Sequence, residues 1–175
     1  MKKIYILQMY SQTIPSKFIR MITNYQYTHV AISLDKSCDK IYSFGRKKIN
    51  TILNGGFTIE SKTSEFYTKF SETICKIFEI EVTEEQYEII KNIISEMEEN
   101  EEKYKYDLLG IVIRFFRIPI TFENKYVCSY FVAELLEKAK IHKFTKRTCF
   151  IKPKDFEEIK EMNKIYEGMY QKYQN

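Results

Sequence analysis

Residues 126–136 have the sequence YVCSYFVAELL, and this stretch decides the fold. Tyr126 and Val127 are typical of extended backbone, whereas the residues after Cys128 place apolar side chains at helical spacing. The pattern predicts that an extended segment runs into a helix, with Cys128 in the first helical turn. Unpaired backbone N–H groups and the positive end of the helix dipole stabilise a thiolate at such a position. Cys128 is therefore a candidate nucleophile, and a small buried apolar residue is the alternative.

A nucleophilic cysteine needs a base, and the chain contains two histidines. His142 lies in a polar, basic stretch after the predicted helix, where a cation is favoured without any catalytic role. His29 begins the sequence HVAISL at residues 29–34, in which large apolar residues alternate with small or polar ones. This alternation predicts a strand, and the small residues on the histidine face leave room for a helix terminus to approach the imidazole. The alternative for His29 is a buried histidine held by one hydrogen bond.

A third polar group normally orients the imidazole of such a pair. Residues 41–46 have the sequence IYSFGR, which predicts a second strand that forms a hairpin with the strand of His29. If Ser43 shares the face of His29, its hydroxyl can accept a hydrogen bond from the ring. Asp35 and Glu60 are competing acceptors that the sequence does not place.

Other segments carry local signals of strand, helix or turn. The predicted strands are Lys2–Tyr10, Ile74–Val82 and Ile165–Tyr173. The predicted helices are Ile14 to Thr23 behind N-cap hydroxyls at Ser11–Thr13, a capping-box helix from Thr83 to Asn100, Tyr104–Phe116, and a last helix that begins at Pro153. Asn54, Gly55 and Gly56 predict a turn between Ile52–Leu53 and Phe57–Ile59. No repeat or linker divides the chain, so we expect a single α+β domain over residues 1–175.

Composition excludes several classes of protein. The chain has 175 residues, 44% of them hydrophobic, with 5 Gly and 3 Pro, which excludes disordered and fibrous proteins. No apolar run reaches the roughly 20 residues of a membrane helix, so we expect no stable membrane insertion. The formal net charge is only +4, the longest basic cluster is Arg46–Lys48, and acidic residues concentrate at Glu96–Glu102, so we expect two solvated surfaces and no nucleic-acid partner. The start, MKKIYIL, has too short an apolar stretch for a signal peptide, which favours a cytoplasmic protein.

The four cysteines show no CxxC or zinc-finger spacing, so thiols in a reducing compartment are expected. A metal site through His29 and Cys128 is a weaker hypothesis, because a zinc ion takes three or four protein ligands and no further ligand stands out. We therefore predict no metal and no organic cofactor.

The segments YTHVAISL at residues 27–34 and YVCSYFVAELL at residues 126–136 resemble the circularly permuted branch of the NlpC/P60 papain-like superfamily. The likeness is greatest to YiiX/YaeF-type proteins and more distant to lecithin–retinol acyltransferase-like enzymes. In that branch the histidine strand precedes the cysteine helix, as it does here. The resemblance implies a papain-like fold whose antiparallel sheet packs against the nucleophile helix, with Cys128 as nucleophile and His29 as base. The third polar residue of the family, often Glu, falls at or beside Ser43.

These observations predict a cysteine-dependent hydrolase or acyltransferase that acts on an amide, ester or thioester of a small molecule, peptide or lipid. Arg46 is a candidate for binding an anionic group, and an ordinary surface arginine is its alternative. Tyr106 is a candidate hydrogen-bond donor near the site, where related enzymes often keep a tyrosine, and a core tyrosine is its alternative. The second functional hypothesis is a catalytically weak or inactive papain-like fold that serves as a ligand-binding or interaction module, because a hydroxyl at Ser43 accepts more weakly than a carboxylate.

Overall fold

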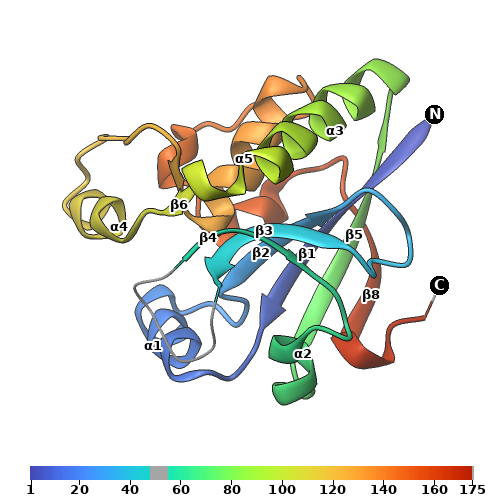
Figure 1. The fold of residues 1–175 in the computed structure, drawn as a ribbon, viewed down its shortest axis with the longest axis horizontal. Helices are drawn as coiled ribbons and strands as arrows, with labels where there is room; N and C mark the ends of the chain where they lie inside the picture. The colour runs from blue at the N-terminus through green and yellow to red at the C-terminus, as the bar shows by residue number, and fades with distance from the viewer. Residues whose placement is uncertain (48–54, 175) are drawn as a thin grey trace.

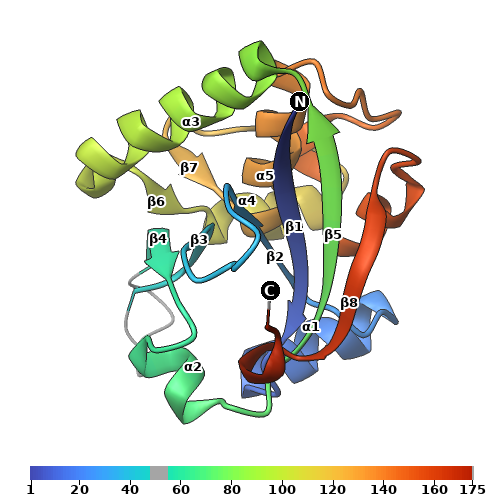
Figure 2. The ribbon, with the colours of Figure 1, turned by 90° about the vertical axis from the view of Figure 1, so that its right-hand side faces the viewer.

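The structure is a computed structural model that describes residues 1–47 and 55–174. Over these residues the chain forms an eight-stranded sheet in the order β7-β6-β4-β3-β2-β1-β5-β8 (Figures 1 and 2). Strands β6 and β7 run parallel, and the other neighbouring pairs run antiparallel. The strands are β1 Lys2–Tyr10, β2 His29–Ser33, β3 Ile41–Arg46, β4 Gly55–Glu60, β5 Ile74–Val82, β6 Lys105–Tyr106, β7 Lys125–Tyr126 and β8 Asn163–Met169.

Helices cover both faces of this sheet, so the architecture is mixed α and β, as predicted. Helices α3 and α5 lie over one face, and α2 lies on the opposite side of the sheet (Figure 1). None of the described helices is long and apolar enough to cross a bilayer. The α-helices are α1 Ile14–Thr23, α2 Glu65–Lys69, α3 Glu84–Glu99, α4 Leu108–Phe115 and α5 Cys128–Lys138, and 3-10 turns span Glu101–Lys103, Thr148–Phe150, Pro153–Glu158 and Tyr170–Lys172.

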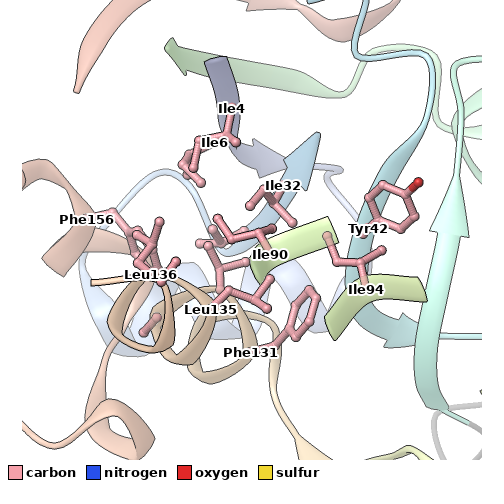
Figure 3. Packing of buried hydrophobic residues seen from close by; sticks show 14 of the residues in the cluster. Ile4, Ile6, Ile32, Tyr42, Ile90, Ile94, Phe131, Leu135, Leu136 and Phe156 are labelled. Carbon is pink, nitrogen blue, oxygen red and sulfur yellow. The ribbon is translucent and has the colours of Figure 1, made fainter. Parts of the chain in front are cut away.

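Strand β1 lies inside the sheet and is buried on both faces. Its alternate residues Ile4 and Ile6 belong to one apolar core, whereas Tyr5, Leu7 and Met9 belong to another. The first core fills the space between the sheet and helices α3 and α5, as Figure 3 shows for Ile4, Ile6, Ile32, Tyr42, Ile90, Ile94, Phe131, Leu135, Leu136 and Phe156. The second core is closed by α2 and the C-terminal segment. A strand that is apolar on both faces therefore separates two cores.

Helix α5 packs on β2 and β3, and this contact brings the cysteine of the helix to the histidine strand. The two strands share the register pair Ile32↔Tyr42, which lies away from the start of β2. The hydroxyl of Ser129 donates to the carbonyl of Ile151 at 2.5 Å and anchors the first turn of α5. The backbone N–H of Val30, the second residue of β2, donates toward the Cys128 sulfur, so the start of the helix lies beside the start of β2.

The elements with strong local signals form as the sequence predicts. Helix α1 begins after Thr13, whose hydroxyl accepts a hydrogen bond from the N–H of Ser16 at 3.4 Å. Helix α3 has a complete capping box, in which Thr83 and Gln86 each accept from the backbone N–H of the other. The strand predicted at Ile74–Val82 is β5.

Other predictions for individual elements are wrong. Gly55 and Gly56 lie in β4 and not in a turn, and Asn54 with the Ile52–Leu53 segment lies outside the described residues. The helix expected from Tyr104 begins only at Leu108, because the residues before it form β6. The helix expected at Pro153 is a 3-10 turn that ends at Glu158. Helix α2 was not predicted.

Candidate active site

A cavity of about 200 Å³ lies where the start of β2 and the end of β3 meet the start of α5. Cys128 and His29 both line it, although they are far apart in the sequence. Helices α1 and α4 form further parts of its wall through residues such as Ser16 and Ile111. The predicted substrate-binding residues also line this cavity, as does Glu60. The fold therefore gathers most of the predicted site residues around one space.

Cys128 is the first residue of α5, and the preceding N-cap, Val127, places no side chain on the free N–H groups of the helix. Burial raises the pKa of the Cys128 thiol above its ordinary value. The backbone N–H groups of Val30, Ser129 and Cys128 donate toward the sulfur and lower that pKa in part. The thiol is therefore neutral at rest, and three amide donors surround the position where negative charge would form.

His29 is fixed by a chain of hydrogen bonds across β3 and β4. Its Nε2 lies 3.2 Å from the hydroxyl oxygen of Ser43, which lies 3.0 Å from that of Thr58. Thr58 in turn donates to the backbone carbonyl of Ser43 at 3.3 Å. Because each hydroxyl has a single proton, this order makes Ser43 donate to Thr58 and accept from Nε2–H of His29. The chain thus assigns the tautomer in which Nδ1 carries the lone pair of a base.

The electrostatic surroundings keep the imidazole neutral. Burial and the nearby charge of Arg46 lower the pKa of His29 to about 4. Among the described residues, no carboxylate hydrogen-bonds this ring. The series of hydrogen bonds from His29 through Ser43 and Thr58 ends at the backbone carbonyl of Ser43. Val30, whose N–H reaches the Cys128 sulfur, follows His29 directly in β2. A neutral base and a neutral thiol therefore lie at the same end of one strand.

Arg46 and Tyr106 both face the cavity. Arg46 lies with its Cζ 5.8 Å from the centre of the Phe66 ring. Its positive charge lowers the pKa values of three groups around the cavity, namely His29, Glu60 and Tyr106. Burial raises the pKa of the Tyr106 hydroxyl, and proximity to Cys128 raises it further. Tyr106 is therefore a neutral hydroxyl close to the sulfur.

The two competing acceptors for His29 lie elsewhere. Asp35 accepts from the backbone N–H of Ser37 at 2.7 Å in the turn between β2 and β3. Glu60 lines the cavity but hydrogen-bonds the buried Tyr67. Burial raises the pKa of Glu60 to about 7, against the lowering effects of Tyr67 and Arg46. Ser43 is therefore the residue that contacts the imidazole, and Glu60 is a separate titratable group in the same cavity.

Thr58 is a site residue that the sequence analysis did not identify. It lies opposite Ser43 in the register of β3 and β4, so its position follows from strand pairing and not from any local motif. Gly45 shapes the same region, because a Cβ there would lie 3.8 Å from Cε1 of the His29 ring. The alternation of residues along IYSFGR identified Ser43, but its partner could be found only with the register known.

The described residues contain no group of three or more His, Cys, Asp or Glu side chains that could hold a metal ion. His142 does not line the cavity, and its Nδ1 lies 3.6 Å from a carboxylate oxygen of Glu161. The second histidine is therefore not part of this site. No family model, curated protein or solved structure matches this chain. Function has to be argued from the geometry of the cavity.

Proposed function

We propose that the protein is a cysteine-dependent hydrolase or acyltransferase with a permuted papain-like arrangement, acting on an amide, ester or thioester. The observation that carries the proposal is the convergence of Cys128, three amide donors and the neutral imidazole of His29 on one cavity. A thiol nucleophile needs a base, a group that orients the base and donors for the oxyanion. We assign these roles to His29 as the base, to Ser43 as the group that orients it, and to the amide N–H groups around Cys128 as the donors for the oxyanion.

In the proposed reaction, the Cys128 sulfur attacks the substrate carbonyl while Nδ1 of His29 takes the thiol proton. The carbonyl oxygen becomes an oxyanion, and the backbone N–H groups at the start of α5 stabilise it. When the tetrahedral intermediate collapses, the C–N, C–O or C–S bond breaks and His29 returns the proton to the leaving group. Water or an acceptor nucleophile then attacks the thioester, with His29 again as base, and releases the Cys128 thiol.

Arg46 and Tyr106 are proposed to bind the substrate. The guanidinium of Arg46 suits an anionic group near the scissile bond, and the hydroxyl of Tyr106 can donate to a substrate oxygen. Glu60 lies in the same cavity with a pKa of about 7, so its charge changes near neutral pH. Binding of a cationic or polar substrate group is therefore expected to vary across that range.

A second function, a ligand-binding module without catalysis, is favoured by the resting protonation states. The pKa of Cys128 is raised and that of His29 is lowered to about 4, so an ion pair between thiolate and imidazolium is not preformed. Ser43 offers a hydroxyl where a carboxylate would stabilise the imidazolium better. This arrangement would bind a carbonyl compound without cleaving it.

Alkylation by iodoacetamide separates the two functions. Cys128 and Cys149 are each 6% exposed, whereas Cys38 and Cys75 are fully buried, so Cys149 is the matched control. If the protein is an enzyme, we expect Cys128 to react at least about tenfold faster than Cys149 at neutral pH, because His29 in the same cavity takes the thiol proton as the sulfur attacks. His29→Asn should slow the reaction of Cys128 and leave that of Cys149 unchanged. Peptide mass spectrometry resolves the sites.

Acyl transfer is tested with p-nitrophenyl butyrate as the acyl donor. We expect a butyryl thioester at Cys128 in the native protein, release of p-nitrophenol that continues after the first turnover, and neither in Cys128→Ala. Equal alkylation of Cys128 and Cys149, insensitive to His29→Asn, together with no acylation of Cys128, would favour the binding module and reject the enzyme.

A further inference from the structure

Exposed apolar side chains are concentrated on α1 and on the segment that contains α4. Ile14 is 84% exposed and Phe116 is 68% exposed, fractions that are unusual for side chains of this size. We call the set the α1–α4 face, and its exposed apolar members are Ile14, Ile19, Met21, Leu109, Ile111, Phe116, Ile118 and Ile120. A cluster of this kind on one side of a protein marks a surface that contacts another apolar body.

The two halves of this face lie next to each other around the cavity. Ile19 of α1 and Ile111 of α4 both line the cavity wall, so apolar residues continue from the surface to its mouth. Figure 1 shows α1 and α4 on the same side of the molecule, away from β8. A body that covers the α1–α4 face therefore also covers the approach to Cys128.

All charged residues of the two segments are basic. Residues 11–28 and residues 108–122 contain no Asp or Glu, and their charged side chains are Lys17, Arg20, Arg114 and Arg117. Arg114 pairs with Asp107 inside the protein, whereas the other three cations are exposed. Apolar side chains interspersed with exposed cations are typical of segments that lie in the interface of an anionic bilayer.

A second hollow beside α1 adds a site for an anionic headgroup. Lys17, Arg20, Asn24 and Gln26 line it, together with Met21 and the tyrosines Tyr10 and Tyr25. Arg20 is held over the ring of Tyr10, with its Cζ 5.1 Å from the ring centre. Two cations and two amides around one hollow, next to exposed apolar residues, match the phosphate and acyl parts of a phospholipid.

We propose that the α1–α4 face docks the protein on the surface of an anionic membrane, with its apolar side chains among the acyl chains and Lys17, Arg20 and Arg117 at the headgroups. The protein lies on the bilayer and does not span it. The mouth of the cavity then opens toward the lipid, so an amphiphilic ligand enters without crossing water. Docking requires the surface alone and does not depend on catalysis at Cys128.

A second copy of the chain fits this face less well than a membrane. Pairing two copies through it would bring the same cations together without a carboxylate from either segment to neutralise them. Nucleic acid fits less well too, because large aliphatic side chains separate the cations, which do not form a continuous basic stripe. An anionic bilayer satisfies the apolar and the cationic residues together.

Co-flotation with large vesicles tests the proposal on the full chain. We expect binding to phosphatidylcholine vesicles that contain about one quarter phosphatidylglycerol, weaker binding to pure phosphatidylcholine, and loss of binding at about 1 M salt. The variants Ile14→Ser/Met21→Ser and Ile118→Ser/Ile120→Ser should each weaken the apparent affinity at least about tenfold. Lys17→Gln/Arg20→Gln/Arg117→Gln should weaken it about fivefold for each cation removed.

Matched control variants distinguish binding through the α1–α4 face from nonspecific binding through any exposed apolar or cationic side chain. Met169→Ser removes an exposed apolar residue of β8, and Lys36→Gln/Lys160→Gln/Lys172→Gln removes three exposed cations outside the face. Both should bind vesicles as the native chain does, and circular dichroism should report the native fold in every variant. Absence of vesicle binding, or equal binding by face and control variants, overturns the proposal. A dimer in sedimentation velocity that the serine variants abolish overturns it in favour of a second copy.

Discussion

Because His29 is neutral at rest, its neighbours would have to stabilise the charge that forms in the proposed reaction. Because its pKa is about 4, taking a proton from Cys128 in the proposed reaction would create an imidazolium in a buried place near Arg46. The hydroxyl of Ser43 at 3.2 Å stabilises that cation less than a carboxylate would. In the proposed reaction, stabilisation of the transition state would therefore fall mainly on the amide donors around Cys128.

Glu60→Gln is predicted to stabilise the protein above neutral pH. The pKa of Glu60 is about 7 in the folded chain and about 4.5 in the unfolded chain, so the folded state holds its proton between these values. The contribution of Glu60 to stability is therefore full below about pH 4.5 and falls as pH rises through 7, by up to about 3 kcal/mol. Glutamine stays neutral and should remove that loss. Urea unfolding at about pH 5 and pH 8 measures it.

His29 acts with the opposite sign over an overlapping pH range, so the effect of Glu60 is the difference between the native chain and the Glu60→Gln variant. Its folded pKa is lowered, so its contribution is present above about pH 6.5 and is lost as pH falls through 4. Glu60→Gln should leave the loss of stability at low pH, which is due to His29, unchanged. It should remove the loss of stability at higher pH, which is due to Glu60. If the stability of the native chain and of the variant changes by the same amount between about pH 5 and pH 8, the Glu60 carboxyl is not held protonated in the cavity.

At the scale of elements, α4 is fixed by a buried ion pair at its N-terminus. Asp107 caps the helix through the N–H of Gly110 at 2.9 Å and pairs with Nη1 of Arg114 at 2.8 Å. A Cβ on Gly110 would overlap Oδ2 of Asp107 and lie 2.6 Å from Nη1 of Arg114. The glycine is therefore required by the ion pair and not by the helix.

Gly110→Ala is predicted to destabilise the protein by about 2–4 kcal/mol. Disrupting a buried pair costs about 3–5 kcal/mol, and the better helix propensity of alanine returns about 1 kcal/mol. Urea unfolding measures the difference. Leu109→Ala is the neighbouring control, because Leu109 is exposed and its loss should change the free energy of unfolding by less than about 0.5 kcal/mol. A net stabilisation by Gly110→Ala would show that propensity outweighs the pair.

Elements with local signals were predictable, and those that depend on tertiary contact were not. The capping box of α3 and the N-cap Thr13 of α1 act within one helical turn, so sequence spacing is enough to find them. Gly56 is the contrary case. It suggested a turn, yet it lies in β4, where the pairing with β6 brings the carbonyl oxygen of Tyr104 so close that a Cβ would clash with it. That approach is visible only once β4 and β6 are paired.

The candidate site divides in the same way. The helix start at Cys128 and the strand face of His29 and Ser43 follow from periodicity, and the contact between the last two is present. The position of Thr58 beside Ser43 depends on the register of β3 and β4. The cavity itself is formed by the packing of α1 and α4 around the strand ends. Neither has a local sequence signal, because both arise from residues far apart in the chain.

At the scale of the whole molecule, the sheet separates two cores that support the site from opposite faces. The core under α3 and α5 holds the helix of Cys128, and the core beside α2 holds Tyr67, which contacts Glu60. Tyr170 closes the second core. It is fully buried, its ring centre lies 4.9 Å from that of Tyr67, and its hydroxyl donates to the carbonyl of Cys38 at 2.7 Å. The C-terminal segment is thereby linked to the cavity wall.

Tyr170→Ala is predicted to open the second core without opening the first. Removal of a buried aromatic ring costs about 3–5 kcal/mol, whereas Tyr170→Phe loses only the hydrogen bond to Cys38 and costs about 1–2 kcal/mol. In the alanine variant, Cys38 and Cys75, which share the core with Tyr170, should react with iodoacetamide faster than in the native chain. The rate at Cys128 should change little, because its helix packs on the other face. Urea unfolding and site-resolved alkylation give both readouts. If all four cysteines gain reactivity together, the two cores unfold as one unit, and the sheet does not insulate the helix of Cys128 from the second core.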